Sequence, residues 1–151
     1  MKAIQDHYPP NFAHCYGCGP ANPFGHHLKS YVVDDRTDAR FTPDQRYSGG
    51  VPDNVYGGMI ASLLDCHGTA SAAAFAYRER ARVMGDAGAP VRFVTASLQI
   101  DFRKPAPLGE ELLITGTLKS LAGRKAYVSL SLSASGVECA HGEMLAVELK
   151  T

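Results

Sequence analysis

The sequence has no surplus of charge of either sign. Its 15 lysine and arginine residues are balanced by 15 aspartate and glutamate residues, so the formal net charge is zero. Proteins that bind nucleic acids usually carry a basic surplus. The balance therefore argues against a nucleic-acid partner.

Long hydrophobic runs are missing as well. No apolar stretch approaches the roughly 20 residues that a helix needs to cross a bilayer, and residues 1–10 lack the apolar core of a signal peptide. We therefore expect no membrane partner and a cytoplasmic location. The sequence also contains neither a serine nucleophile elbow nor a glycine-rich phosphate-binding loop.

Cysteine is scarce, with four residues in a chain of 151: Cys15, Cys18, Cys66 and Cys139. This density is below that of a secreted disulfide scaffold, so we expect reduced thiols. The segment Cys15-Tyr16-Gly17-Cys18-Gly19 resembles half of a zinc site, but a structural site usually shows a second ligand pair. His26-His27 could supply that pair, whereas Cys66 and Cys139 lie inside a predicted helix and a predicted strand. We therefore expect a glycine-rich, thiol-containing loop without metal.

One segment has the features of a long helix. Residues 56–82 contain no proline, and alanine dominates after residue 69. The first half of this segment is apolar on nearly every side, which predicts burial all round. The segment is preceded by an irregular leader over residues 1–26, a predicted strand at 28–33 and a short extended stretch near 39–42.

The rest of the chain is typical of β-strands. Apolar and polar residues alternate over 94–102 and again over 126–133, and further strands are predicted at 112–118 and 137–149. The pattern predicts a single α+β domain over residues 27–151. One helix can cover only one face of a curled sheet, so the other face and the strand edges need partners. We therefore expect at least a homodimer.

Asp65 is the residue most indicative of chemistry. It follows the apolar run 59–64 within the predicted helix, where an ionised carboxylate is costly unless it is hydrogen-bonded or faces a cavity. Two interpretations stay open. Asp65 is a general base or a nucleophilic carboxylate, or it turns toward a solvent gap or a structural partner such as Ser62.

Gly57 and Gly58 open the same predicted helix. Free N–H groups at a helix N-terminus can stabilise a developing oxyanion. Asp65 lies about two turns further on, roughly 11 Å along the axis, so a site using both groups needs the helix of a second subunit. The alternative is that the glycines only permit close packing of the helix against the sheet.

Two other groups are weaker candidates. His67 lies two residues from Asp65 and must point to a different face of the helix. Arg124 and Lys125 follow a turn glycine and could meet a phosphate, although a solvated hairpin tip also explains such a pair.

Several segments together resemble the PaaI-type hotdog thioesterases. The helix signature Val55-Tyr56-Gly57-Gly58-Met59-Ile60-Ala61-Ser62-Leu63-Leu64-Asp65, followed by Gly68, is similar to theirs. The Cys15–Gly19 segment, Asn22-Pro23-Phe24-Gly25 and Leu28-Lys29 resemble the N-terminal part of one branch. The run 94–98 leading to Phe102-Arg103-Lys104-Pro105 resembles the next strand. The resemblance covers about residues 14–148.

The resemblance implies a fold, an activity and a site. The fold would be a curved antiparallel sheet of five to six strands wrapped around one long helix, in dimers that often pair again. The activity would be hydrolysis of acyl-CoA with no metal and no cofactor, CoA arriving as part of the substrate. Asp65 would act as general base or nucleophile, and Thr95 would position the water. Gly58, with Gly57 beside it, would polarise the thioester carbonyl from the other subunit.

Two positions depart from the family pattern. Tyr56 stands where a histidine commonly precedes the paired glycines, and Gly50 stands where many members have asparagine. We place Tyr56 and Asn54, with Arg124 and Lys125, in substrate binding. The departures leave an alternative open, in which the protein binds acyl-CoA or another small ligand without hydrolysing it. A dehydratase of the same fold would usually work with a histidine and an Asp or Glu as a pair, and none of the six histidines is convincing in that role.

Overall fold

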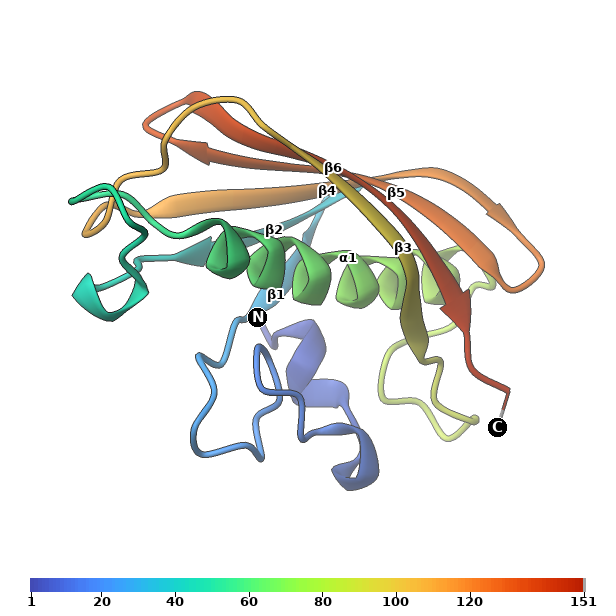
Figure 1. Cartoon of the computed structure of the whole chain (residues 1–151). Helices are drawn as coiled ribbons and strands as arrows, with labels where there is room; N and C mark the ends of the chain where they lie inside the picture. Colours follow the sequence, from blue (N-terminus) through green and yellow to red (C-terminus); the bar gives the residue numbers. More distant parts are fainter. Residues whose placement is uncertain (151) are drawn as a thin grey trace.

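The computed structural model describes residues 1–150; Thr151, the last residue of the expected domain, lies outside them. Figure 1 shows the sheet with the long helix beneath it. The strands are β1 (Ser30–Val33), β2 (Arg36–Phe41), β3 (Phe93–Phe102), β4 (Leu112–Ala122), β5 (Lys125–Ala134) and β6 (Val137–Glu148), and the helix is α1 (Gly57–Glu79). Two short 3-10 turns precede the first strand, and a third lies between β2 and α1. No helix in this part of the chain is long and apolar enough to cross a membrane.

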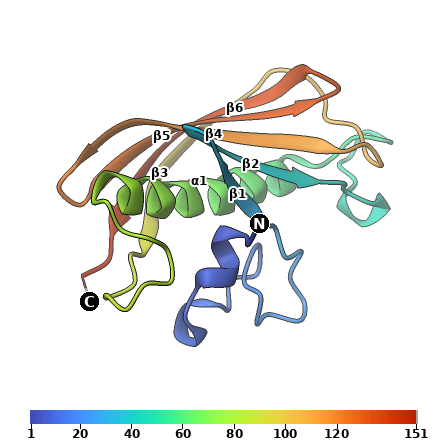
Figure 2. The ribbon, with the colours of Figure 1, turned by 180° about the vertical axis from the view of Figure 1, so that it is seen from behind.

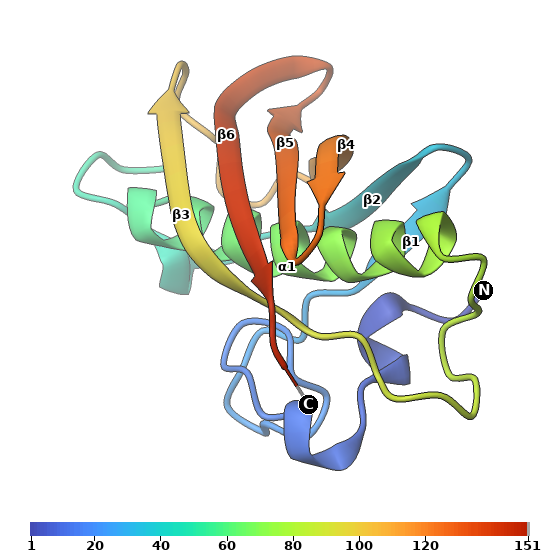
Figure 3. The same cartoon turned by 90° about the vertical axis from the view of Figure 1, so that its right-hand side faces the viewer.

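The strands form one antiparallel sheet that curls around α1. Their order is β1-β2-β4-β5-β6-β3, so β1 and β3 are the two edges. Figure 3 shows the helix lying along the concave face of this sheet. The expected fold class, a six-stranded antiparallel sheet around one long helix, is confirmed.

The helix is packed on every side along most of its length. Leu63 and Leu64 are fully buried, and so are the small side chains at 70, 72, 73 and 76. Gly68 lies against Met144, with no room for a β-carbon. The helix ends at Glu79, three residues before the predicted end, because Ala81 takes a left-handed backbone conformation (φ 53°).

The leader, residues 1–26, covers the face of α1 that the sheet leaves open, as Figure 2 shows from behind. Ile4 and Gln5 of its first turn are buried. The Gln5 side chain donates to the Ser30 hydroxyl at 3.0 Å and accepts from the Ser30 N–H at 2.8 Å. The leader is therefore tied to β1 by polar contacts and to α1 by apolar packing.

The predicted alternation is confirmed in β5 and fails in β3. In β5 every second residue from Ala126 to Ala134 is buried. In β3, Val94 and Phe102 are 41% and 56% exposed, although both were expected on the inner face. The register of β3 against β6 shifts between Thr95 and Ser97. This β-bulge inserts an extra residue, so Val94 lies on the face opposite to that of Leu98 and Ile100. Phe102 keeps the phase of Leu98 and Ile100, and its exposed ring lies beside Gly57 at the end of the strand.

Candidate active site

Asp65 lies in the third turn of α1 and points toward β3. Its side chain is half-buried, and its Oδ1 accepts a hydrogen bond from the Thr95 hydroxyl at 2.5 Å. Ser62, the structural partner considered above, instead places its hydroxyl 3.0 Å from Nε2 of His26. The structure thus brings together Asp65 and Thr95, two residues that the sequence analysis proposed for one site.

The bulge in β3 is what aims Thr95 at the helix. Phe93 is buried and Thr95 shares its side of the strand, while Leu98 and Ile100 also pack against the core. Strict alternation would have turned Thr95 away from the face that Leu98 occupies. The extra residue between Thr95 and Ser97 puts both on the helix side. Bulges often re-aim a side chain next to a functional site in this way.

The N-terminus of α1 offers unpaired donors. Tyr56 is the N-cap residue, and no acceptor within residues 1–150 is bonded to the N–H groups of Gly57 and Gly58. The Tyr56 ring lies across Gly58, so a β-carbon there would lie 2.4 Å from Cε2 of the ring. Gly58 is therefore required for the close approach of Tyr56, and its N–H remains free for a ligand.

These donors and Asp65 lie far apart within one chain. Seven residues separate Gly58 from Asp65, which is roughly 11 Å along a helix axis. Strand β3 runs antiparallel to α1, so Phe102 lies beside Gly57 at one end while Thr95 contacts Asp65 at the other. One chain alone therefore holds the two halves of the expected site at separate places.

Tyr56 and Asn54 both lie at the N-terminal end of α1. Tyr56 is 45% exposed, and Asn54 forms an isolated backbone bridge to Pro107. Beside them a groove of about 270 Å³ is lined by Val55, Gly57, Ile60 and residues 102–106. Arg103 and Lys104 bring positive charge to this groove. Sequence reasoning missed these two, although a basic pair directly after a strand is a visible signal.

Arg124 and Lys125 occupy the β4–β5 hairpin, as predicted. The Arg124 guanidinium donates two hydrogen bonds to the Glu148 carbonyl, at 3.0 and 2.8 Å. Lys125 pairs with Val147, which pairs in turn with Val94, the neighbour of Thr95. Two strand spacings, about 10 Å, therefore separate Lys125 from that end of β3.

His67 faces the opposite side of α1 from Asp65, as the spacing predicted. It is fully buried, and its ring nitrogens lie 2.8 Å from the Ser30 hydroxyl and 3.1 Å from the Thr37 hydroxyl. Burial lowers the pKa of His67 to about 4. This imidazole is neutral and sealed from solvent, so it offers no acid or base to a substrate.

Cys66, between Asp65 and His67, faces the leader. Its sulfur lies 3.8 Å from that of Cys15, and the sulfurs of Cys15, Cys18 and Cys66 all lie within 4.8 Å of one another. The thiols of Cys18 and Cys66 and the N–H groups of Gly17 and Cys18 lower the pKa of Cys15. The premise that Cys66 could not join the loop cysteines is therefore wrong, because the leader folds directly over this turn of the helix.

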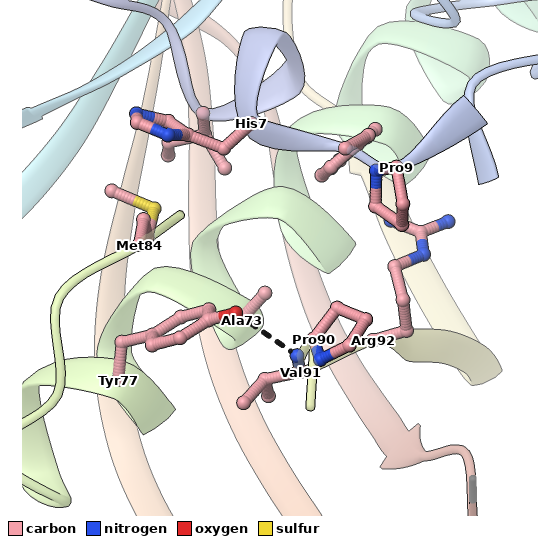
Figure 4. Close-up of a pocket in the computed structure, with 10 residues that line it drawn as sticks. His7, Pro9, Ala73, Tyr77, Met84, Pro90, Val91 and Arg92 are labelled. Carbon is pink, nitrogen blue, oxygen red and sulfur yellow. Dashed lines mark hydrogen bonds between the residues drawn. The ribbon is translucent and has the colours of Figure 1, made fainter. Parts of the chain in front are cut away.

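A second cavity lies between the leader and the C-terminal half of α1 (Figure 4). It is lined by residues of both segments, among them Tyr8, Ala73 and Tyr77, and the Tyr77 hydroxyl accepts from the Val91 N–H at 3.1 Å. Its volume of about 10 Å³ accommodates at most one water molecule. This cavity therefore has no room for an acyl chain.

The chain matches the family model described as Thioesterase superfamily over residues 53–140. Rat acyl-coenzyme A thioesterase THEM4 is 32% identical over 101 residues, which make up 67% of this chain and 37% of that protein. The chain thus spans little more than a third of that relative's length.

Solved structures give the same picture. A thioesterase superfamily protein from Shewanella loihica is 41% identical, with a TM-score of 0.69, over 93% of this chain and 97% of that one. The E. coli PaaI protein from the phenylacetic acid degradation operon is 14% identical, with a TM-score of 0.66, over 82% of this chain and 80% of that one, which shows a shared fold. The Cys15–Gly19 segment precedes residues 53–140, so its place in the resemblance stays a prediction.

Proposed function

Since the chain belongs to the thioesterase superfamily, we propose that it hydrolyses acyl-CoA thioesters to a free acid and CoA. The observation that carries the proposal is the carboxylate of Asp65, held by the Thr95 hydroxyl at 2.5 Å on a helix that is otherwise apolar there. The name of the rat relative, an acyl-coenzyme A thioesterase, supports this substrate class.

Asp65 supplies the base or the nucleophile. Thr95 occupies one acceptor position on Oδ1, and a carboxylate has about four such positions. The remaining positions can accept a proton from water or attack the acyl carbon directly. A positioned base typically contributes about 10² to 10⁴ in rate, so loss of the Asp65 carboxylate should lower turnover by about that factor.

The oxyanion donors come from a second copy of the chain. β3 is an edge strand whose outer side has no partner within residues 1–150, and it exposes Val94 and Phe102. An antiparallel pairing of two β3 strands centred near Leu98 would set Thr95 of one copy opposite Phe102 of the other. Since Phe102 lies beside Gly57, this pairing would bring the Gly58 N–H of one helix toward Asp65 of the other.

Substrate contacts follow from the same arrangement. Tyr56 and Asn54 lie at the N-terminal end of α1, where the thioester would meet the free N–H groups. Arg124 and Lys125 would face the phosphates of CoA at the hairpin end of the sheet. Pairing of dimers into tetramers, which the resemblance implies, remains part of this proposal.

A second function is favoured by two specific positions. Tyr56 replaces the usual histidine, and its ring packs against Gly58. Gly50 replaces the usual asparagine and lies in open space, with no atom within 4 Å of where a β-carbon would be. Both changes remove polar groups that orient a thioester, so the alternative is a protein that binds acyl-CoA without turning it over.

Thiol release from a panel of aliphatic and aromatic acyl-CoAs decides between the two functions. The decisive variant is Asp65→Asn, which keeps the shape but removes the charge, and it should lower turnover by about 10² to 10⁴. The exposed Asp35→Asn is the matched control and should leave turnover unchanged. Hydrolysis by Asp65→Asn at the wild-type rate would refute the role of Asp65. Binding of acyl-CoA by a wild type that releases no thiol would establish the alternative.

A further inference from the structure

Three thiols from two distant parts of the sequence converge beside α1. Cys15 and Cys18 come from the leader, and Cys66 comes from the third turn of the helix. Their sulfurs lie within 4.8 Å of one another, and the Cys15 and Cys66 sulfurs are 3.8 Å apart. Cys18 and Cys66 are buried, while Cys15 is exposed to solvent. The cluster is thus enclosed on one side and accessible on the other.

The spacing fits a thiolate-bound metal ion. Zinc holds thiolate sulfurs at about 2.3 Å in a tetrahedron, which sets neighbouring sulfurs about 3.8 Å apart. The Cys15–Cys66 separation of 3.8 Å already has this length. A disulfide, with sulfurs about 2.05 Å apart, would use two of the three thiols and leave the third unexplained.

The loop is shaped to hold its two sulfurs against the helix. The Gly19 N–H donates to the Cys15 carbonyl at 2.8 Å, and this bond closes a tight turn over the Cys15–Gly19 segment. Gly17 lies so close to the helix that a β-carbon there would be 2.3 Å from the Cys66 sulfur. Glycine is therefore needed at this position to bring the loop onto Cys66.

A candidate fourth ligand, His26, lies just outside the group of three sulfurs that are within 4.8 Å of one another. The same β-carbon position at Gly17 is 3.6 Å from Nε2 of His26, so this nitrogen faces the space next to the Cys66 sulfur. His26 Nε2 has one hydrogen-bonding neighbour, the Ser62 hydroxyl at 3.0 Å. His27 points elsewhere, with its Nε2 against the Asn22 carbonyl. Of the two histidines, only His26 therefore accompanies the thiols.

We propose that Cys15, Cys18, Cys66 and His26 bind one thiophilic divalent ion of the zinc class. Three thiolates and one neutral imidazole form a closed ligand set, which is typical of a structural site. Binding would release the thiol protons to solvent. The ion would clamp the leader to α1 at the residue next to Asp65. This inference replaces the expectation of a metal-free loop, and it does not depend on thioesterase activity.

Cobalt titration of the chelator-treated, reduced full chain tests the proposal. Co²⁺ bound by thiolates gives an intense sulfur-to-metal absorption in the near ultraviolet, and it should saturate at about one ion per chain. Zinc should displace the cobalt and raise the melting temperature. Cys18→Ser and Cys66→Ser should lose the absorption, and His26→Gln should bind cobalt more weakly. Cys139→Ser is the matched control, because Cys139 lies in β6 outside the cluster, and it should titrate like the wild type.

Other results would overturn the proposal. One is a reduced wild type that binds neither ion while its circular dichroism stays native. A second is an unchanged absorption in Cys18→Ser, which would exclude the cluster as the site. If the serine variants fail to fold, the wild-type titration still decides, together with a Cys15→Ser variant whose changed side chain is exposed. Recovery of a disulfide among these cysteines in protein grown with zinc and purified without reductant would assign the cluster to redox chemistry instead.

Discussion

Asp65 and His67 lie two residues apart on α1, yet their surroundings are opposite. His67 is fully buried, and each ring nitrogen faces a hydroxyl, those of Ser30 and Thr37. Asp65 is half-buried, and the Thr95 hydroxyl is the one hydrogen-bond partner of its carboxylate within residues 1–150. Both are polar groups on a mostly apolar helix, so residue type alone does not separate them.

The difference lies in unused bonding capacity. The His67 imidazole has two ring nitrogens and both have partners, so it joins β1 and β2 to the helix and has nothing left for a ligand. The Asp65 carboxylate keeps most of its acceptor positions open, and they face the edge of the sheet. A buried polar group with all its partners present contributes to stability, whereas one with open positions is a candidate for chemistry.

After loss of the Asp65 carboxylate itself, the largest effect should come from removing the other half of the shared site, the Gly58 N–H. Gly58→Pro removes the free N–H at a helix position that tolerates proline, and loss of one oxyanion donor typically costs about 10² to 10³ in turnover. Gly58→Ala is the control, because it brings the same contact with the Tyr56 ring but keeps the N–H. Thiol-release rates of both variants measure the difference, and we expect the alanine variant to retain far more activity.

Mixing two inactive variants then tests whether Asp65 is completed by another copy. When Gly58→Pro and Asp65→Asn chains are refolded together, about half of the dimers are hybrids, and each hybrid has one intact site. Activity should recover to about a quarter of the wild-type value. If mass measurement demonstrates the hybrids and no activity recovers, Gly58 and Asp65 of the same chain must act together, and the proposed site shared between two copies is wrong.

A smaller effect, on stability rather than turnover, is expected from His67. Burial lowers its pKa in the folded state from 6.5 to about 4. Between these pH values the unfolded chain binds a proton that the folded chain does not, so the stability present above pH 6.5 is lost as the pH falls toward 4. Urea unfolding at pH 7 and pH 5 should differ by on the order of 1–2 kcal/mol from this group.

His67→Gln supplies the control for that measurement. The amide keeps a donor and an acceptor but does not titrate, so this share of the pH dependence should vanish. Turnover per folded molecule should stay near the wild-type value, since His67 lies on the face of α1 away from Asp65. An equal pH slope in wild type and variant would mean that His67 is not the neutral group that the geometry indicates.

Much of this arrangement could be predicted from the sequence. The proline-free segment gave the helix to within one residue at its start and three at its end, and the alternation in β5 matches the structure. Asp65, Gly58 and Thr95 were all identified as candidates. The separation of Gly58 from Asp65 follows from the helical rise, which the sequence reveals.

The rest depends on contacts between residues distant in the sequence. No local signal marks the bulge between Thr95 and Ser97. The alternation of apolar and polar residues in the sequence does not show whether the strand contains an extra residue. The approach of Cys66 to Cys15 likewise depends on how the leader docks on the helix. The sequence shows that Cys66 lies inside a helix. Which segment its side chain contacts depends on the direction in which it points from that helix.

The smallest effect should come from Arg124. Its bonding is intermediate between that of His67, whose ring nitrogens both have partners, and that of Asp65, whose carboxylate is mostly open. Two of its guanidinium N–H groups bind the Glu148 carbonyl, as in a structural residue, while the others remain free, as in a binding residue. Lys125 makes no side-chain hydrogen bond or ion pair within the described chain.

If the hairpin faces the phosphates of CoA, Arg124→Ala and Lys125→Ala should each raise KM for acyl-CoA by about fivefold at most, the scale of exposed ion pairs. The rise should fade with added salt, because exposed charges are screened over about 10 Å at 0.1 M. Arg36→Ala is the matched control, since that exposed arginine lies in the β1–β2 hairpin, on the side of the sheet far from β3. An increase in KM that persists in high salt for Arg124→Ala alone would trace to the lost Glu148 contact. An unchanged KM in both variants at low salt would leave the pair as a solvated turn.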